Sequence, residues 1–113
     1  MQRYKEIDLD QSSDFEVLIE VDRIEEANGN YSGYVVSSQM RKSPYSETFY
    51  EFTANYDVST TEYKSIVKLS MDSANTSNIF PGRYLFDVVS TSEENKKTKV
   101  AYGVVDVYST VTR

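Results

Sequence analysis

Residues 83–108 read RYLFDVVSTSEENKKTKVAYGVVDVY, and this stretch decides the fold class. Its two apolar runs, 83–91 and 98–108, alternate their side chains between two faces with the two-residue period of a β-strand. The charged segment between them, 92–97, is typical of a hairpin loop. The sequence therefore predicts two strands here that pair antiparallel with each other.

The rest of the chain shows mostly the same pattern. Apolar side chains alternate with largely charged ones over residues 15–22, which predicts a strand with one dry and one wet face. Residues 73–79 instead begin with helix-capping side chains and run into a Pro-Gly pair, so they predict one short helical turn. Asn28 and Gly29 predict a tight reversal, and the polar stretch 54–62 predicts a loop. Further strands are predicted for residues 3–9, 34–42, 48–53 and 63–71.

These segments predict an all-β fold, namely an antiparallel immunoglobulin-like β-sandwich of about seven strands with one short helical turn near residues 73–79. A chain of 113 residues is one domain on the usual scale, so residues 1–113 are expected to form a single β-sandwich domain. Residues 1–10 are expected to be an N-terminal arm or an edge strand. As an edge strand, residues 2–10 could pair with a neighbouring subunit.

The composition favours sheet and leaves little room for catalysis. Val, Ile and Thr number 13, 5 and 9 against 4 Leu, 4 Ala and 3 Met, and 10 Tyr and 5 Phe add to the β-forming residues. The chain has no Cys, His or Trp. Disulfides, thiol nucleophiles and metal sites built on Cys or His are therefore excluded. The side chain most used for proton transfer near neutral pH is also missing, so we expect no enzyme.

The charge balance argues against polyanionic partners. Twelve Lys and Arg against eighteen Asp and Glu give a net charge of −6, the wrong sign for nucleic acid or an anionic membrane surface. The longest apolar runs are pairs or triplets, far short of the ~20 residues of a membrane span. The N-terminal residues contain no apolar stretch of signal-peptide length. We therefore expect no nucleic-acid partner, no membrane association, and assembly in a cytoplasm.

Carboxylates and serines suggest three chemical sites, and each has a simpler structural interpretation. Asp8, Asp10 and Asp14 lack the turn glycine and terminal glutamate of a calcium loop. The acidic pairs at 25–26 and 93–94 should stay solvated, because acid–base work needs two carboxyls that converge from different segments. The fifteen serines have neither a histidine nor a Gly-x-Ser-x-Gly elbow to activate them. We therefore predict no catalytic residue, no metal and no cofactor.

Several residues have predicted structural roles in turns and strands. Gly82 should supply a backbone conformation that a Cβ would resist, so that the next strand can begin at once. Gly103, in mid-strand, should mark a β-bulge or a close approach by an aromatic ring. Asp87 should accept a hydrogen bond from a loop amide or pair with Arg41. The predicted structural turn residues are Gly33, Pro81, Gly82 and Gly103.

The tyrosines are the candidates for an interface. Ten of them are too many for a small domain to bury with a hydrogen-bond partner for each hydroxyl. Exposed tyrosines suit protein interfaces and sugar-stacking platforms alike. Tyr45, Tyr50 and Tyr56 are the candidates for an exposed cluster in a subunit contact. With the N-terminal edge added, the predicted interface residues are Tyr4, Ile7, Leu9, Tyr45, Tyr50 and Tyr56.

Short motifs follow one another in order from residue 33 to the C-terminus. They are GY at 33–34, QMRKS at 39–43, FT at 52–53, SANT at 73–76, PGRYLFDV at 81–88, GVVDV at 103–107 and VTR at 111–113. This order resembles small virion structural proteins of tailed bacteriophages, including those common in cyanophages, and is similar to the N-terminal modules of phage upper baseplate proteins. The resemblance covers residues 15–113. It implies an immunoglobulin-like or related sandwich that serves as a building block or attachment module of a virion, without catalysis.

The expected function is therefore that of a non-enzymatic virion protein, an assembly or adaptor module of the neck, tail or baseplate. Its partners would be other virion proteins and further copies of itself in a symmetric ring. One alternative is a capsid decoration protein on the head. Another is a carbohydrate- or receptor-binding module that uses tyrosines as a stacking surface. The expected location is the virion, assembled in the host cytoplasm.

Overall fold

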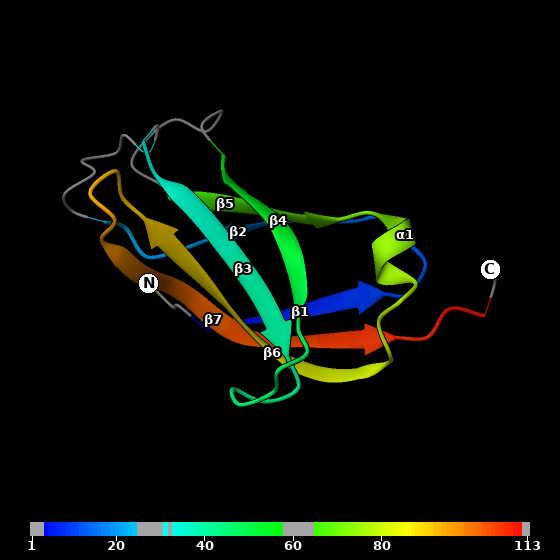
Figure 1. Cartoon of the computed structure of the whole chain (residues 1–113). Helices are drawn as coiled ribbons and strands as arrows, with labels where there is room; N and C mark the ends of the chain where they lie inside the picture. Colours follow the sequence, from blue (N-terminus) through cyan, green and yellow to red (C-terminus); the bar gives the residue numbers. More distant parts are fainter. Residues whose placement is uncertain (1–3, 25–30, 32, 58–64, 112–113) are drawn as a thin grey trace.

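Figure 1 shows a computed structural model of the chain, which describes residues 4–24, 31, 33–57 and 65–111. These residues contain seven strands and one helix of a single turn, α1 (Ser73–Thr76). In this part of the chain no helix is long and apolar enough to cross a membrane. The strands are β1 (Tyr4–Asp10), β2 (Phe15–Glu20), β3 (Val35–Arg41), β4 (Tyr50–Tyr56), β5 (Ile66–Met71), β6 (Gly82–Thr91) and β7 (Lys97–Tyr108).

All seven strands join in one sheet with the order β1-β7-β6-β3-β4-β5-β2. Strand β4 connects the two halves, because residues 50–52 pair with β3 and residues 53–56 pair with β5. The sheet curls into a nearly closed, barrel-like shape and leaves β1 and β2 as its two edges (Figure 1). The prediction of an all-β fold is confirmed, and so is the short helical turn.

The prediction of antiparallel pairing is wrong for one pair of strands. β1 runs parallel to β7, with Tyr4 opposite Tyr102 and Asp10 opposite Tyr108. The ladders that join the other strands are antiparallel, including the predicted β6–β7 hairpin. The alternation of side chains is the same for either strand direction. Periodicity therefore could not give the direction of β1, which has no hairpin partner.

Strand β1 belongs to the core of its own chain. Ile7 and Leu9 are buried, and Leu9 is 0 % exposed. Ile7 and Leu9 are therefore core residues of this chain, which contradicts the prediction that they are contact residues, whereas the pairing of residues 2–10 with a neighbouring subunit stays a prediction. Parallel pairing with β7 gives these two apolar side chains a place to be buried within the chain, which removes the reason to seek one outside it.

Side chains that face the interior form one core. Along β2, β3, β5 and β6 the more buried positions alternate with more exposed ones as predicted. Burial of one large aliphatic side chain contributes roughly 1.5–3 kcal/mol relative to its exposure, so strands with several such positions are strongly held. Fully buried core residues contributed by different elements include Leu9, Met40, Leu69, Ile79, Val88 and Val105.

Strand β4 begins and ends later than the sequence predicts. Ala54, Asn55 and Tyr56 pair with β5, although they lie in a stretch predicted to be a loop. Thr53 and Asn55 are exposed, so this part of β4 has a polar outer face and a composition close to that of a loop. The predicted reversal at residues 28–29 and the rest of the predicted loop, 58–62, lie outside the described residues.

Helix α1 is fixed by polar contacts to the turn between β1 and β2. Asp72 caps the helix by accepting a hydrogen bond from the Asn75 N–H at 3.0 Å. The Ser73 N–H donates to Asp14 Oδ1 at 2.8 Å. The Thr76 hydroxyl donates to the Ser13 carbonyl, also at 2.8 Å. These bonds hold the beginning of β2 against the beginning of the helix.

Glycine is required at two positions. Gly103 lies opposite Lys5, and an added Cβ would overlap the Lys5 carbonyl oxygen. The close approach is thus made by a backbone and not by an aromatic ring, and the bulge lies instead between Val88 and Val89. Gly82 has a φ of +142°, in the region that favours glycine, which confirms its predicted role.

The other two predicted turn residues, Gly33 and Pro81, lie in connections between strands. The Tyr34 N–H donates to the Tyr31 carbonyl at 3.0 Å and closes a turn that contains Gly33. Pro81 directly precedes β6, where its missing N–H removes no hydrogen bond from the ladder. Both residues therefore act through chain geometry.

Replacing Gly103 by alanine should push β1 away from β7. We expect the free energy of unfolding to fall by about 1–3 kcal/mol, the usual cost of overpacking, because the added methyl group meets backbone that cannot swing aside. Hydrogen exchange should speed up most at the Ile7 and Leu9 amides. Gly33→Ala is the control, since its Cβ would meet only the flexible Glu93 side chain. Equal melting of the two variants would contradict the close approach.

Candidate protein-contact surface

The outer face is the name used here for the side of β1, β7, β6 and β3 that points away from the core. Strand register places its side chains in rows that run across the strands. One row contains Tyr4, Tyr102, Asp87 and Gln39, the next contains Glu6, Val104, Leu85 and Arg41, and a third contains Asp8, Asp106 and Arg83.

The centre of the outer face is aromatic and apolar. Tyr4 and Tyr102 are each 43 % exposed, and Leu85 is 40 % exposed. The two tyrosine rings meet edge to face, with centroids 5.7 Å apart and planes at 73°. Beside them, Leu85 and Tyr102 line a shallow depression of about 580 Å³. Exposed aromatic and aliphatic side chains next to a depression are typical of a surface that contacts protein.

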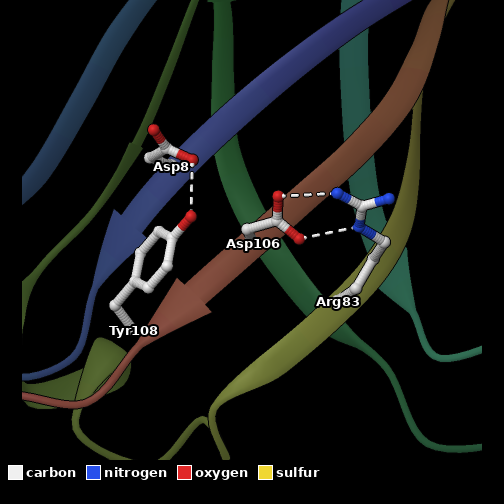
Figure 2. Close-up of polar contacts among 4 residues, drawn as sticks. All are labelled: Asp8, Arg83, Asp106 and Tyr108. Carbon is white, nitrogen blue, oxygen red and sulfur yellow. Dashed lines mark hydrogen bonds and ion pairs between the residues drawn. The ribbon is translucent and has the colours of Figure 1, made fainter.

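Paired charges border this centre on one side. Figure 2 shows Arg83 and Asp106 joined by two parallel hydrogen bonds, from Nε to Oδ1 at 2.8 Å and from Nη2 to Oδ2 at 3.1 Å. The Tyr108 hydroxyl lies 3.4 Å from Asp8 Oδ1 (Figure 2). These contacts connect β6 with β7 and β7 with β1. The bidentate pair fixes both side chains in one orientation.

The same contacts shift the ionisation of these groups. The hydrogen bond from Arg83 lowers the pKa of Asp106 below its ordinary value. The negative charge of Asp8 raises the pKa of Tyr108 above its ordinary value. Asp106 therefore stays charged and Tyr108 stays neutral throughout the physiological pH range, so this border of the outer face has a constant charge pattern.

Arg41 anchors the border of the outer face on β3. Its guanidinium donates to the Ser46 carbonyl at 2.5 Å and to Gln39 Oε1 at 2.9 Å. Its Cζ also lies 4.6 Å from the centroid of the Phe49 ring, in a cation–π contact. The predicted pair of Asp87 with Arg41 is wrong, because Asp87 instead lies 3.9 Å from Lys99 Nζ.

The predicted tyrosine cluster does not form. Tyr45 is 93 % exposed in the connection between β3 and β4. Tyr50 is half-buried and packs edge-on against Tyr84 with centroids 5.9 Å apart. Tyr56 lies at the other end of β4, which is about 20 Å away at 3.3 Å per residue. Of the six predicted interface residues, Tyr4 lies on the outer face.

Tyr56 is part of an internal aromatic group. Its ring stacks on Tyr31 with centroids 4.2 Å apart, and its hydroxyl donates to Ser90 Oγ at 2.8 Å. Burial raises the pKa of Tyr56 to about 12. The Tyr31 hydroxyl in turn accepts a hydrogen bond from the Ile24 N–H at 3.1 Å. Tyr56 is therefore a structural residue and not a contact residue.

Most of the outer face was not predicted from the sequence. The alternation predicted for residues 83–91 places Leu85 on the face opposite that of Tyr84, as observed, but the pairing of Arg83 with Asp106 depends on the bulge between Val88 and Val89. Near the loop, Thr91 pairs with Lys97, and counting back from this register would place Arg83 opposite a residue that faces the core. The bulge shifts the ladder by one residue, because Val100 of β7 has no residue opposite it in β6 between the pairs Val88–Ala101 and Val89–Lys99, and a valine at such a position carries no sequence signal for a bulge.

Acidic side chains are frequent on this surface without forming a metal site. In residues 4–24, 31, 33–57 and 65–111, no group of three or more carboxylates is arranged to hold a metal ion. Asp8 instead contacts Tyr108, and Asp14 accepts from the Ser73 N–H.

Stability should depend on pH through Tyr56. Its pKa is 10.0 when unperturbed and about 12 in the fold. The contribution of this ionisation to the free energy of unfolding is therefore fully present below pH 10 and is lost as pH rises toward 12. We expect Tyr56→Phe to lower the free energy of unfolding by about 1 kcal/mol near neutral pH, because the hydrogen bond to Ser90 is lost. The variant should also show a smaller decrease in the free energy of unfolding at alkaline pH. Urea unfolding at several pH values measures both effects. Tyr45→Phe, at an exposed site, should change neither; an unaltered alkaline fall in the Tyr56 variant would contradict the burial.

No protein-family model matches the chain, and the search of curated proteins finds no match. The relationship to virion proteins of tailed phages accordingly stays a prediction that depends on the motifs and on the surface described above.

Proposed function

We propose that this chain is a non-enzymatic structural protein of a tailed-phage virion, an assembly or adaptor module of the neck, tail or baseplate. The observation that carries the proposal is the outer face. Exposed Tyr4, Tyr102 and Leu85 form its apolar centre, and hydrogen-bonded charges surround that centre. A desolvatable aromatic centre with a polar rim is the usual anatomy of a protein interface.

We further infer an immunoglobulin-like organisation of the sheet. In that fold strands C, F and G lie together, and strands B, E and D form the other layer. The order β7-β6-β3 followed by β4-β5-β2 corresponds to G-F-C followed by D-E-B. The Tyr84 hydroxyl near the start of β6 donates to the Phe80 carbonyl four residues upstream, at 2.7 Å. This bond has the geometry of the tyrosine corner, found at the same place in immunoglobulin-like domains.

The ring geometry favours a protein partner over a sugar. A sugar-stacking platform needs an aromatic face presented flat to the ligand. The Tyr4 and Tyr102 rings are instead at 73° to each other and support one another edge-on. Rigid tyrosines with polar tips beside an aliphatic side chain are well suited to a contact between folded proteins.

Assembly would follow from repetition of one contact. Copies arranged around a rotation axis can each present the outer face to a different patch of the neighbour, and the ring closes when the rotation does. The constant charges of Arg83 and Asp106 would set the orientation of the neighbour, since charge complementarity mainly determines register and specificity. The module would take its place in the virion during assembly in the host cytoplasm.

Replacing Leu85 by arginine should disrupt the contact. The change puts a charge beside Arg41 and Arg83 in the apolar centre, and we expect self-association to weaken by roughly tenfold or more. Sedimentation velocity of the full chain over a range of concentrations measures this. Val111→Arg is the control, because Val111 is fully exposed outside the sheet. A wild-type chain that stays monomeric, or equal effects of both variants, would contradict self-assembly through this face.

The virion assignment is tested on particles. Mass spectrometry of purified phage particles whose genome encodes this chain should detect it in a fixed ratio to the major structural proteins. The ratio should stay constant through repeated density-gradient purification, because a built-in component cannot be washed away. Loss of the chain during purification would contradict the assignment, whatever the outcome of the sedimentation experiment.

A further inference from the structure

A groove runs between the two edge strands of the sheet. It measures about 350 Å³ and is lined by residues of both β1 and β2. β1 pairs with β7 and β2 pairs with β5, and within the described residues no ladder joins β1 to β2. Each strand therefore has one edge without a strand partner, and these edges flank the groove.

The hydrogen-bond pattern shows which backbone groups of β2 face outward. The Val21 N–H donates to the Ser65 carbonyl at 2.8 Å, so this pair is a hydrogen-bonded one. In an antiparallel ladder such pairs alternate with non-bonded pairs. The residues of β2 whose N–H and C=O groups turn away from β5, toward the open edge, are Glu16, Leu18 and Glu20.

The floor of the groove is apolar and incompletely covered. Ile7 and Ile19 are buried, whereas Phe15 and Val17 next to them are half-buried. Leu18, on the opposite side of β2, is 53 % exposed. A strand added alongside β2 would cover apolar surface on both faces, which is the main source of affinity beyond the backbone hydrogen bonds.

The walls of the groove are strongly acidic. Its charged lining residues are Glu6, Asp8, Asp10, Asp14, Glu16 and Lys5. Lys68, on β5, lies 3.4 Å from Glu16, but both side chains are exposed, and such pairs contribute little and exchange easily. The excess of five carboxylates over one lysine favours a cationic occupant.

The charge pattern also disfavours a second copy of the chain on this edge. Two β2 strands paired antiparallel about Leu18 would place Glu16 of each copy opposite Glu20 of the other. Like charges directly opposite across a ladder are destabilising. Acidic side chains at an open edge are one way in which proteins prevent self-pairing while keeping the edge available to a chosen partner.

We propose that the open edge of β2 binds an extended segment of another protein by β-strand addition. The segment would run antiparallel to β2 and carry Lys or Arg opposite Glu16 and Glu20. The residues of the segment that lie opposite Val17 and Ile19 would be small and apolar and would fill the groove. Six residues of β2 offer an edge of ordinary strand length, about 20 Å.

This site borders the outer face, because Glu6 and Asp8 line the groove and also stand in rows of the outer face, but it does not include the apolar centre of that face. Leu85 and Tyr102 lie on strands β6 and β7, whereas the segment would contact β2 and the groove beside it. The strand-addition proposal and the assembly proposal can therefore fail independently, and Leu85→Arg should leave segment binding unchanged.

The probe is the synthetic peptide Thr-Lys-Val-Thr-Val-Lys-Thr, blocked at both ends and added to the isotope-labelled full chain. We expect saturable binding followed by NMR, with the largest amide shifts at Glu16, Leu18 and Glu20. A peptide with both lysines replaced by glutamate should bind roughly tenfold or more weakly. A third peptide carries a methyl group on the backbone nitrogen of its central threonine and of both lysines. It should not bind, because it keeps the side-chain charges but has lost the backbone N–H donors that a strand ladder needs.

A reciprocal charge swap separates binding from folding. The double variant Glu16→Lys with Glu20→Lys should bind the lysine peptide more weakly and the glutamate peptide more tightly than the wild type does. A misfolded protein could not bind the glutamate peptide more tightly. Glu93→Lys with Glu94→Lys, in the loop between β6 and β7, is the matched control and should keep the preference for lysine. No binding, equal binding of the N-methylated peptide, or shifts away from β2 would overturn the proposal. Shifts at β2 that grow with protein concentration alone would identify a second copy as the occupant, and would also overturn it.

Discussion

The parallel contact between β1 and β7 is the constraint on which the rest of the structure depends. It requires that the backbone of Lys5 come so close to position 103 that only a glycine fits there. The pairing buries Leu9 and Ile7, so that the N-terminal strand contributes two side chains to the core. It also turns the other residues of β1 outward, which adds Tyr4 and Asp8 to the outer face.

Two surfaces of different character follow from this one pairing. The outer face is formed by β1 together with its partner β7 and with β6, and the ladders between these strands hold its side chains in rows. The groove lies where β1 has no strand partner, between its free edge and that of β2. The first surface has an aromatic centre with mixed and mutually paired charges, which suits a folded neighbour. The second has free backbone groups and acidic walls, which suit an extended cationic segment.

The two proposals describe a module that works by contact alone. A chain without Cys, His or Trp has few means of catalysis but many of recognition, and several of the tyrosines that the structure describes serve either the interior or the surface. Tyr31, Tyr56 and Tyr84 stabilise the interior through ring packing and hydroxyl hydrogen bonds. Tyr4 and Tyr102 remain accessible on the outer face. An adaptor of this kind could join a folded neighbour on one surface and the arm of another protein on the other.

The amino-acid sequence by itself determined the strand content, the buried faces of β2, β3, β5 and β6, the β6–β7 hairpin, the helical turn and the need for glycine at position 82. All of these are local, because they depend on side-chain period, capping residues and backbone conformation within a few residues. Only the tertiary structure decided the direction of β1, the continuation of β4 through Tyr56, and the bulge that brings Arg83 opposite Asp106. These features depend on which strand lies beside which, and a two-residue period is identical for parallel and antiparallel neighbours. The burial of Leu9 within its own chain was therefore settled by contacts between segments far apart in the chain.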